Sequence, residues 1–83
     1  MTLKTIAKCT EIYKKSASPA FQNIQIGDKV LFSCEIKPSG RNKNTYATYI
    51  HCENMRTGEK SYLSFNQIQR VLDNFEFEEM KYL

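Results

Sequence analysis

His51 is the only histidine of the chain, and the three cysteines are Cys9, Cys34 and Cys52. Any metal site or cysteine–histidine nucleophile built on histidine must therefore use His51. The number of cysteines is odd and they form no C-x-x-C pair, so neither a zinc site nor a disulfide framework is indicated. We expect reduced cysteines that pack as small apolar residues, and we expect no metal or other cofactor.

Signatures of catalysis are absent elsewhere in the sequence. The three glycines are isolated, which excludes the glycine-rich motifs that bind nucleotides and the G-x-S-x-G motif of hydrolases. The only dense group of carboxylates is Glu76, Glu78 and Glu79, and its neighbours Lys81 and Tyr82 are typical of an exposed segment. Since acid–base catalysis needs an apolar pocket that separates carboxyl pKa values, we expect a solvated acidic tail and no enzymatic activity.

Cations and tyrosines are interleaved over residues 37–49. The candidate contact residues are Lys37, Arg41, Lys43, Tyr46 and Tyr49. Because Tyr and Arg are enriched at the energetic centres of protein interfaces, this segment predicts binding to a protein partner. The alternative is single-stranded DNA or RNA, whose phosphates the cations would neutralise and whose bases would stack on the tyrosines. A third interpretation is that the tyrosines only cover one end of the core.

A long antiparallel hairpin must position these residues. Residues 29–37 alternate between apolar and polar types, residues 38–44 are a polar loop, and residues 45–53 form a second strand rich in Thr and Tyr. We expect Ile36 opposite Ile50 and Cys34 opposite Cys52, so that the apolar side chains share one face. His51 then lies on the other face, across from Glu35, as an ordinary cross-strand pair.

The remaining segments predict two helices and further strands. Apolar residues recur at helical spacing over residues 3–15, which indicates an N-terminal amphipathic helix that ends before Pro19. Short strands are expected over residues 21–26 and 60–65. Ser64 and Gln67 form a capping-box pattern that begins a C-terminal helix over residues 65–74. Residues 75–78 alternate again, as a last strand or as a tail folded over the core.

This order of elements predicts an α+β fold. It consists of a curled antiparallel sheet of about four strands with an N-terminal and a C-terminal helix, in a single domain over residues 1–83. The segment Ile26–Val30 resembles the loop-to-strand openings of SH3-like and OB-like barrels, so a small barrel is the nearest named architecture. The expected core residues are Phe32, Cys34, Ile36, Ile50, Leu63, Ile68 and Leu72.

Composition limits the partners and the compartment. The net charge of +3 is too small to require a polyanionic partner. The longest apolar run is Val30-Leu31-Phe32, which is far shorter than a membrane span, so we expect a cytoplasmic protein with no membrane partner. The oligomeric state stays open, and a homodimer through an exposed edge strand is one outcome.

The chain is short and rich in lysine and asparagine, and it has an acidic, aromatic ending over residues 74–79. In these features it resembles the small accessory proteins of phages and other mobile elements of low-GC bacteria. The resemblance implies a stoichiometric inhibitor of a host protein that handles nucleic acid, such as a CRISPR nuclease. The resemblance is one of chain length and composition, and no residue role is carried over from it.

Overall fold

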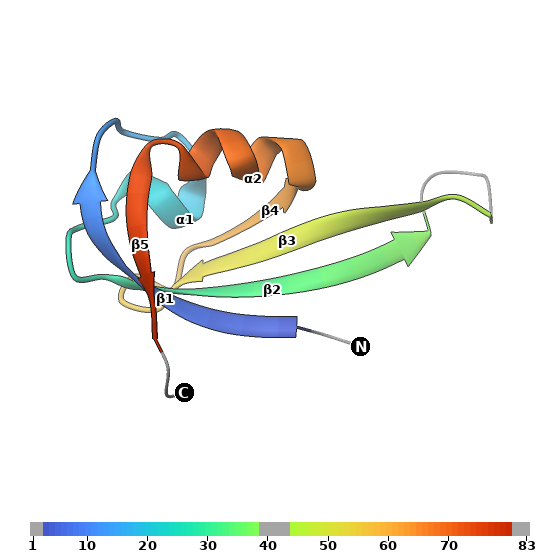
Figure 1. Cartoon of the computed structure of the whole chain (residues 1–83), viewed down its shortest axis with the longest axis horizontal. Helices are drawn as coiled ribbons and strands as arrows, with labels where there is room; N and C mark the ends of the chain where they lie inside the picture. Colours follow the sequence, from blue (N-terminus) through green and yellow to red (C-terminus); the bar gives the residue numbers. More distant parts are fainter. Residues whose placement is uncertain (1–2, 39–43, 81–83) are drawn as a thin grey trace.

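One antiparallel sheet organises the chain, and the computed structural model describes residues 3–38 and 44–80 (Figure 1). The strands lie in the order β4-β3-β2-β1-β5. Their bounds are β1 Leu3–Ile12, β2 Lys29–Pro38, β3 Tyr46–Asn54, β4 Lys60–Ser64 and β5 Phe75–Glu79. Two short helices, α1 (Pro19–Gln22) and α2 (Phe65–Leu72), cover the same face of this sheet (Figure 1).

The predicted long hairpin is confirmed as the β2–β3 ribbon, which extends well beyond the helices in Figure 1. The expected register is wrong by two residues, because Cys34 pairs with Ile50 and Phe32 pairs with Cys52. A shift of two residues leaves every side chain on its expected face, since strand side chains alternate with a period of two. His51 and Glu35 therefore lie on the face opposite the cysteines, as expected.

The predicted N-terminal helix over residues 3–15 is wrong, because residues 3–12 of this segment form β1 and no part of it is helical. β1 pairs with β2 on one side and β5 on the other. Lys4 and Lys8 are four residues apart, a spacing that places two side chains on one face of a strand as well as of a helix. The pairing with two distant strands decides between these alternatives, and local spacing does not.

The short strand predicted over residues 21–26 is also wrong, because Phe21 and Gln22 are the last two residues of α1 and no strand follows before β2. Pro19 opens this helix instead of ending one, and the N–H groups of Phe21 and Gln22 donate to the Ser18 carbonyl. Proline suits the first turn of a helix because its missing N–H would have no intrahelical partner there. Gly27, with a φ of +96°, then turns the chain into β2.

The second half of the chain follows the prediction closely. Ser64 and Gln67 form both hydrogen bonds of the expected capping box at the start of α2, which ends at Leu72. The alternating tail is a strand, β5, whose partner is β1. The architecture is thus α+β with five strands instead of four.

The sheet is not closed, so the predicted barrel is wrong. Closure would require β4 to pair with β5, but these strands lie at opposite edges. The α2 helix joins them by crossing over one face of the sheet (Figure 1). As a result the helices of the described residues cover only one face of the sheet.

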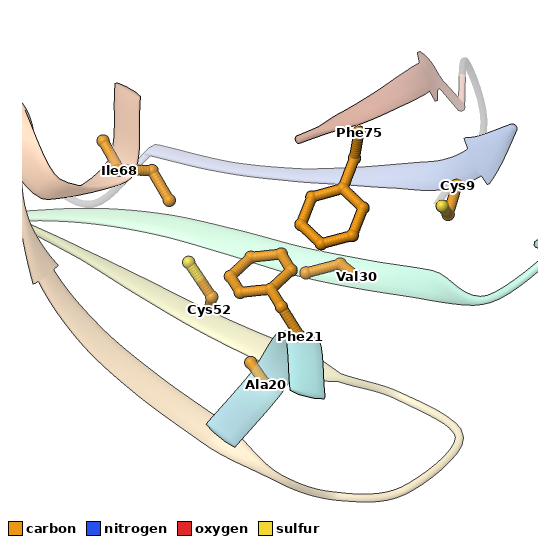
Figure 2. Close-up of a cluster of buried hydrophobic side chains, with 7 residues drawn as sticks. All are labelled: Cys9, Ala20, Phe21, Val30, Cys52, Ile68 and Phe75. Carbon is orange, nitrogen blue, oxygen red and sulfur yellow. The ribbon is translucent and has the colours of Figure 1, made fainter. Parts of the chain in front are cut away.

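Phe21 is the centre of the core between this face and the helices. Figure 2 shows its ring among Val30, Cys52 and Phe75. Its ring centroid lies 5.6 Å from that of Phe75 in a stacked arrangement, and 6.3 Å from that of Phe32. The fully enclosed cluster comprises Cys9, Ala20, Phe21, Val30, Cys52, Ile68 and Phe75.

The expected core is correct only in part. Ile68 is buried as predicted. Four further predicted residues are half-buried and pack against the cluster, namely Phe32, Ile50, Leu63 and Leu72. Cys34 is half-buried outside the cluster, and the prediction for Ile36 is wrong because 66% of it is exposed. Ile36 points to the covered side of the sheet, but on the part of the ribbon that no helix reaches.

A buried carboxylate fixes the turns at one end of the sheet. Asp28 accepts hydrogen bonds from Arg56 Nε at 2.8 Å, from the Gln25 N–H at 2.9 Å and from Asn54 Nδ2 at 3.3 Å. Burial would raise the pKa of Asp28, but these hydrogen bonds outweigh that effect and hold it below its ordinary value. Asp28 therefore links the start of β2 to the turn after β3.

Replacement of Phe21 tests the assignment of the core. We expect Phe21→Ala to lower the free energy of unfolding by about 3–5 kcal/mol, because it leaves a cavity among fully buried groups. Phe32→Ala should cost less, since Phe32 is only half-buried. Urea unfolding measures both losses, and Phe21→Leu keeps the comparison possible if Phe21→Ala does not fold. An equal or larger loss for Phe32→Ala would contradict this core.

Acid sensitivity tests the role of Asp28. Its pKa is lowered on folding, so its contribution is complete above the unfolded pKa of about 3.9 and is lost as the pH falls through the folded value. We expect Asp28→Asn to cost about 2 kcal/mol at pH 7, because the charged acceptor of Arg56 is removed. Urea unfolding between pH 6 and pH 3 should show a weaker pH dependence for Asp28→Asn. The same pH dependence as in the unaltered chain would contradict this role.

Candidate binding face

The sheet face opposite α1 and α2 carries the candidate site, and we call it the open face. Side chains of a strand alternate between the two faces, and the core takes Val30 from β2 and Cys52 from β3. The odd-numbered residues of β2 and β3 therefore point to the open face. Among them are Glu35, Lys37, Tyr49 and His51.

Two aromatic side chains lie on the open face near the β4 edge of the sheet. His51 on β3 and Tyr62 on β4 are directly opposite each other, with ring centroids 4.5 Å apart and ring planes at 86°. Tyr62 is 62% exposed. Such edge-to-face contact holds the imidazole and the phenol in fixed relative positions while leaving the tyrosine available for contact.

Two hollows flank this aromatic pair. One has a volume of about 300 Å³ and is lined by Lys37, Pro38, Tyr49, His51 and Tyr62. The other has a volume of about 170 Å³ and shares His51 and Tyr62 while extending to Leu31 and Lys60. We call the set Lys37, Tyr49, His51 and Tyr62 the tyrosine site.

Charges around the tyrosine site occur in pairs of opposite sign. Glu35 lies 2.5 Å from His51 Nε2 with one carboxylate oxygen and 3.5 Å from Lys37 Nζ with the other. The predicted contact between His51 and Glu35 is present, but it is diagonal, because Ser33 lies directly opposite His51 and Tyr49 directly opposite Glu35. On the neighbouring strands Glu53 lies 3.6 Å from Lys60 Nζ. Lys37 and Lys60 thus already have a carboxylate beside them, so the tyrosine site is not a continuous positive groove.

The structure separates the candidate residues taken from the sequence. Lys37 and Tyr49 lie together at the larger hollow. Tyr46 pairs with Pro38 at the far end of the ribbon, is 63% exposed, and points to the opposite face. Arg41 and Lys43 lie outside the described residues. Of the three candidates that the structure describes, only Lys37 and Tyr49 are therefore placed next to each other.

Sequence reasoning missed Tyr62, although a signal for it exists. Ser61 and Leu63 lie on one face of β4 and Tyr62 on the other, and the turn before β4 makes it a neighbour of β3. Because side chains alternate between faces along β4, and because β4 pairs with β3 as a hairpin, Tyr62 lies beside His51 on the open face. His51 was expected on this face, but as a paired surface residue and not as part of a site.

The cysteines have no catalytic arrangement with the histidine. His51 lies on the open face, whereas Cys34 and Cys52 point to the covered side. All three cysteines are free thiols. Burial raises the pKa of Cys52 to about 12 and also raises that of Cys9. Both thiols are therefore protonated at neutral pH, as expected for residues that serve packing.

Across residues 3–38 and 44–80, no group of three or more His, Cys, Asp or Glu side chains is arranged to hold a metal ion. The same residues contain no helix long and apolar enough to cross a membrane.

Comparisons with protein-family models, with curated proteins and with solved structures find no match to this chain. The open face must therefore be interpreted from its own residues.

Thiol labelling tests the placement of the cysteines. In the native protein we expect a disulfide reagent to modify Cys34 at least tenfold faster than Cys9 or Cys52, since only Cys34 is partly exposed. Mass spectrometry after short labelling identifies the modified residue. Cys34→Ser should leave no rapidly reacting thiol. Rapid modification of Cys52 in the folded protein would contradict the assigned faces of β3.

Proposed function

We propose that this protein is a non-enzymatic binding protein that occupies a surface of a protein partner with its open face. The supporting observation is the tyrosine site, in which exposed aromatic groups lie between charges that are already paired. Aromatic centres with a rim of both signs are typical of protein interfaces. A strand platform held from behind by a packed core also loses little conformational freedom on binding.

The partner should offer an apolar projection that fits the larger hollow, surrounded by both acidic and basic groups. Glu35 and Glu53 would then exchange part of their contacts with Lys37, His51 and Lys60 for contacts with the partner. That the partner is a host enzyme acting on nucleic acid, as the resemblance in composition implies, stays a prediction.

Single-stranded nucleic acid is the second candidate. Tyr49 and Tyr62 on one open sheet face, with Lys37 and Lys60 beside them, offer stacking rings and cations. Glu35 and Glu53 count against this alternative, because they lie between the cations and would repel phosphates. The two candidates differ in their response to salt.

Substitution of tyrosines on opposite faces tests the proposed interface. We expect Tyr62→Ala to weaken capture of a stoichiometric partner from a low-GC bacterial lysate by about 2 kcal/mol, or roughly thirtyfold. Tyr49→Ala should act in the same direction. Tyr46→Ala is the matched control, because Tyr46 is equally exposed but points to the other face. Capture that depends on Tyr46 and not on Tyr62 would contradict the proposal.

An oligonucleotide titration distinguishes the second candidate. At about 50 mM salt a random single-stranded oligonucleotide should show no binding stronger than about 100 μM, because the lysines beside the tyrosine site, Lys37 and Lys60, are paired with carboxylates. Micromolar affinity that falls steeply with salt and is reduced by Tyr62→Ala would instead assign the open face to nucleic acid. Fluorescence anisotropy measures both quantities.

A further inference from the structure

A second surface lies at the other edge of the molecule, on the covered side of the sheet. It is an apolar groove of about 480 Å³ whose lining includes Phe32, Leu72, Phe75 and Phe77. The ring of Phe77 stands edge-on to that of Phe32, with centroids 5.6 Å apart. The groove thus has an aromatic floor that is held in place by the core.

The groove borders a free strand edge. Within residues 3–38 and 44–80, β5 is the last strand of the sheet and pairs only with β1. The Met80 N–H donates to the Ile6 carbonyl of β1 at 2.9 Å. Because strand amides alternate in direction, the N–H groups of Phe77 and Glu79 point away from β1, toward the free edge. An edge of this kind can receive another strand.

The two faces of β5 carry side chains of different chemistry. Phe75 and Phe77 point to the groove, and Glu76 and Glu78 point to the open face. Glu76 accepts a hydrogen bond from the Tyr13 hydroxyl, and Glu79 accepts one from Thr5 at 3.1 Å. Within the part of the chain that the structure describes, none of these three glutamates forms an ion pair. Glu35 and Glu53 differ, because each lies within 4 Å of a lysine Nζ. Lys8 of β1 lies directly opposite Glu78, but the two side chains form no ion pair.

We propose that the β5 edge binds an extended segment of another protein as an added strand. In that segment, lysine or arginine alternates with apolar residues. The apolar side chains would enter the aromatic groove, and the cations on the opposite face would approach Glu76 and Glu78. A second copy of β5 does not fit, because it would place carboxylates opposite carboxylates. This surface is distinct from the tyrosine site and does not depend on its function.

A synthetic peptide tests the proposal without knowledge of the natural partner. The probe is a fluorescein-labelled peptide of eight residues that alternates lysine with valine or phenylalanine. The comparison peptide has the same composition with its apolar residues in one block. Anisotropy titration at about 50 mM salt should give a dissociation constant at least tenfold lower for the alternating peptide. Equal dissociation constants would overturn the proposal.

Variants separate the contributions of charge and backbone. Glu76→Gln/Glu78→Gln should weaken binding of the alternating peptide at least fivefold, whereas Asp73→Asn removes a carboxylate away from the edge and should change it less than twofold. Glu79→Pro removes an outward N–H and should weaken binding at least fivefold relative to Glu79→Gln, which retains it. Circular dichroism confirms that each variant is folded.

Three results would overturn the proposal. Equal weakening by Asp73→Asn and by the edge double variant would indicate general charge attraction. Equal affinity of Glu79→Pro and Glu79→Gln would exclude strand addition. A dimer of the unaltered chain that Glu79→Pro dissociates, measured by sedimentation equilibrium, would assign the edge to a second copy.

Discussion

The packing of Phe21 between the sheet and the two helices is the interaction on which the other features depend. Its ring is 1% exposed and contacts residues contributed by β2, β3 and β5. A chain of 83 residues has enough apolar volume for only one such layer. The helices therefore cover one face of the sheet, and the second face stays open.

This division gives the two faces different chemistry. On the covered side, Cys52 and Ile50 support β3 from behind, so that Tyr49 and His51 project from a strand that is fixed by its packing. The ribbon then extends beyond the helices, which leaves Ile36 and Tyr46 exposed on the covered side. Of the tyrosine site, His51 and Tyr62 therefore lie over the part of the sheet that the core supports, and Lys37 lies on the extension.

The surroundings of the carboxylates differ between the central strands and the β5 edge of the sheet. Glu35 and Glu53 lie on central strands and are matched by cations on the same or adjacent strands. The glutamates of β5 lie on an edge strand with one neighbour, and Lys8, which is opposite Glu78 on that neighbour, forms no ion pair with it. Negative charge on β5 disfavours pairing with a second copy of the same strand. It also favours a basic strand as the partner.

The sequence was sufficient to predict elements whose signals are local. The capping box at Ser64 and the alternation over residues 29–37 each specify an element from its own residues. β1 was missed because lysines four apart suit a helix or a strand, and its two partners, β2 and β5, lie far away in the chain. Of the tyrosine site, only Lys37 and Tyr49 were predicted as contact residues. Tyr62 joins them through the pairing of β3 with β4. Pairing between distant segments is a tertiary property that periodicity does not contain.

Hydroxyl-radical footprinting of the tyrosines, with and without a captured partner, tests the central claim most directly. In the free protein the account predicts ready oxidation of Tyr62, Tyr46 and Tyr13, each about equally exposed. In the complex, Tyr62 and Tyr49 should be protected while Tyr46 and Tyr13 keep their rates. Protection of Tyr46 with unchanged oxidation of Tyr62, or a Tyr62 already protected in the free monomer, would contradict the account.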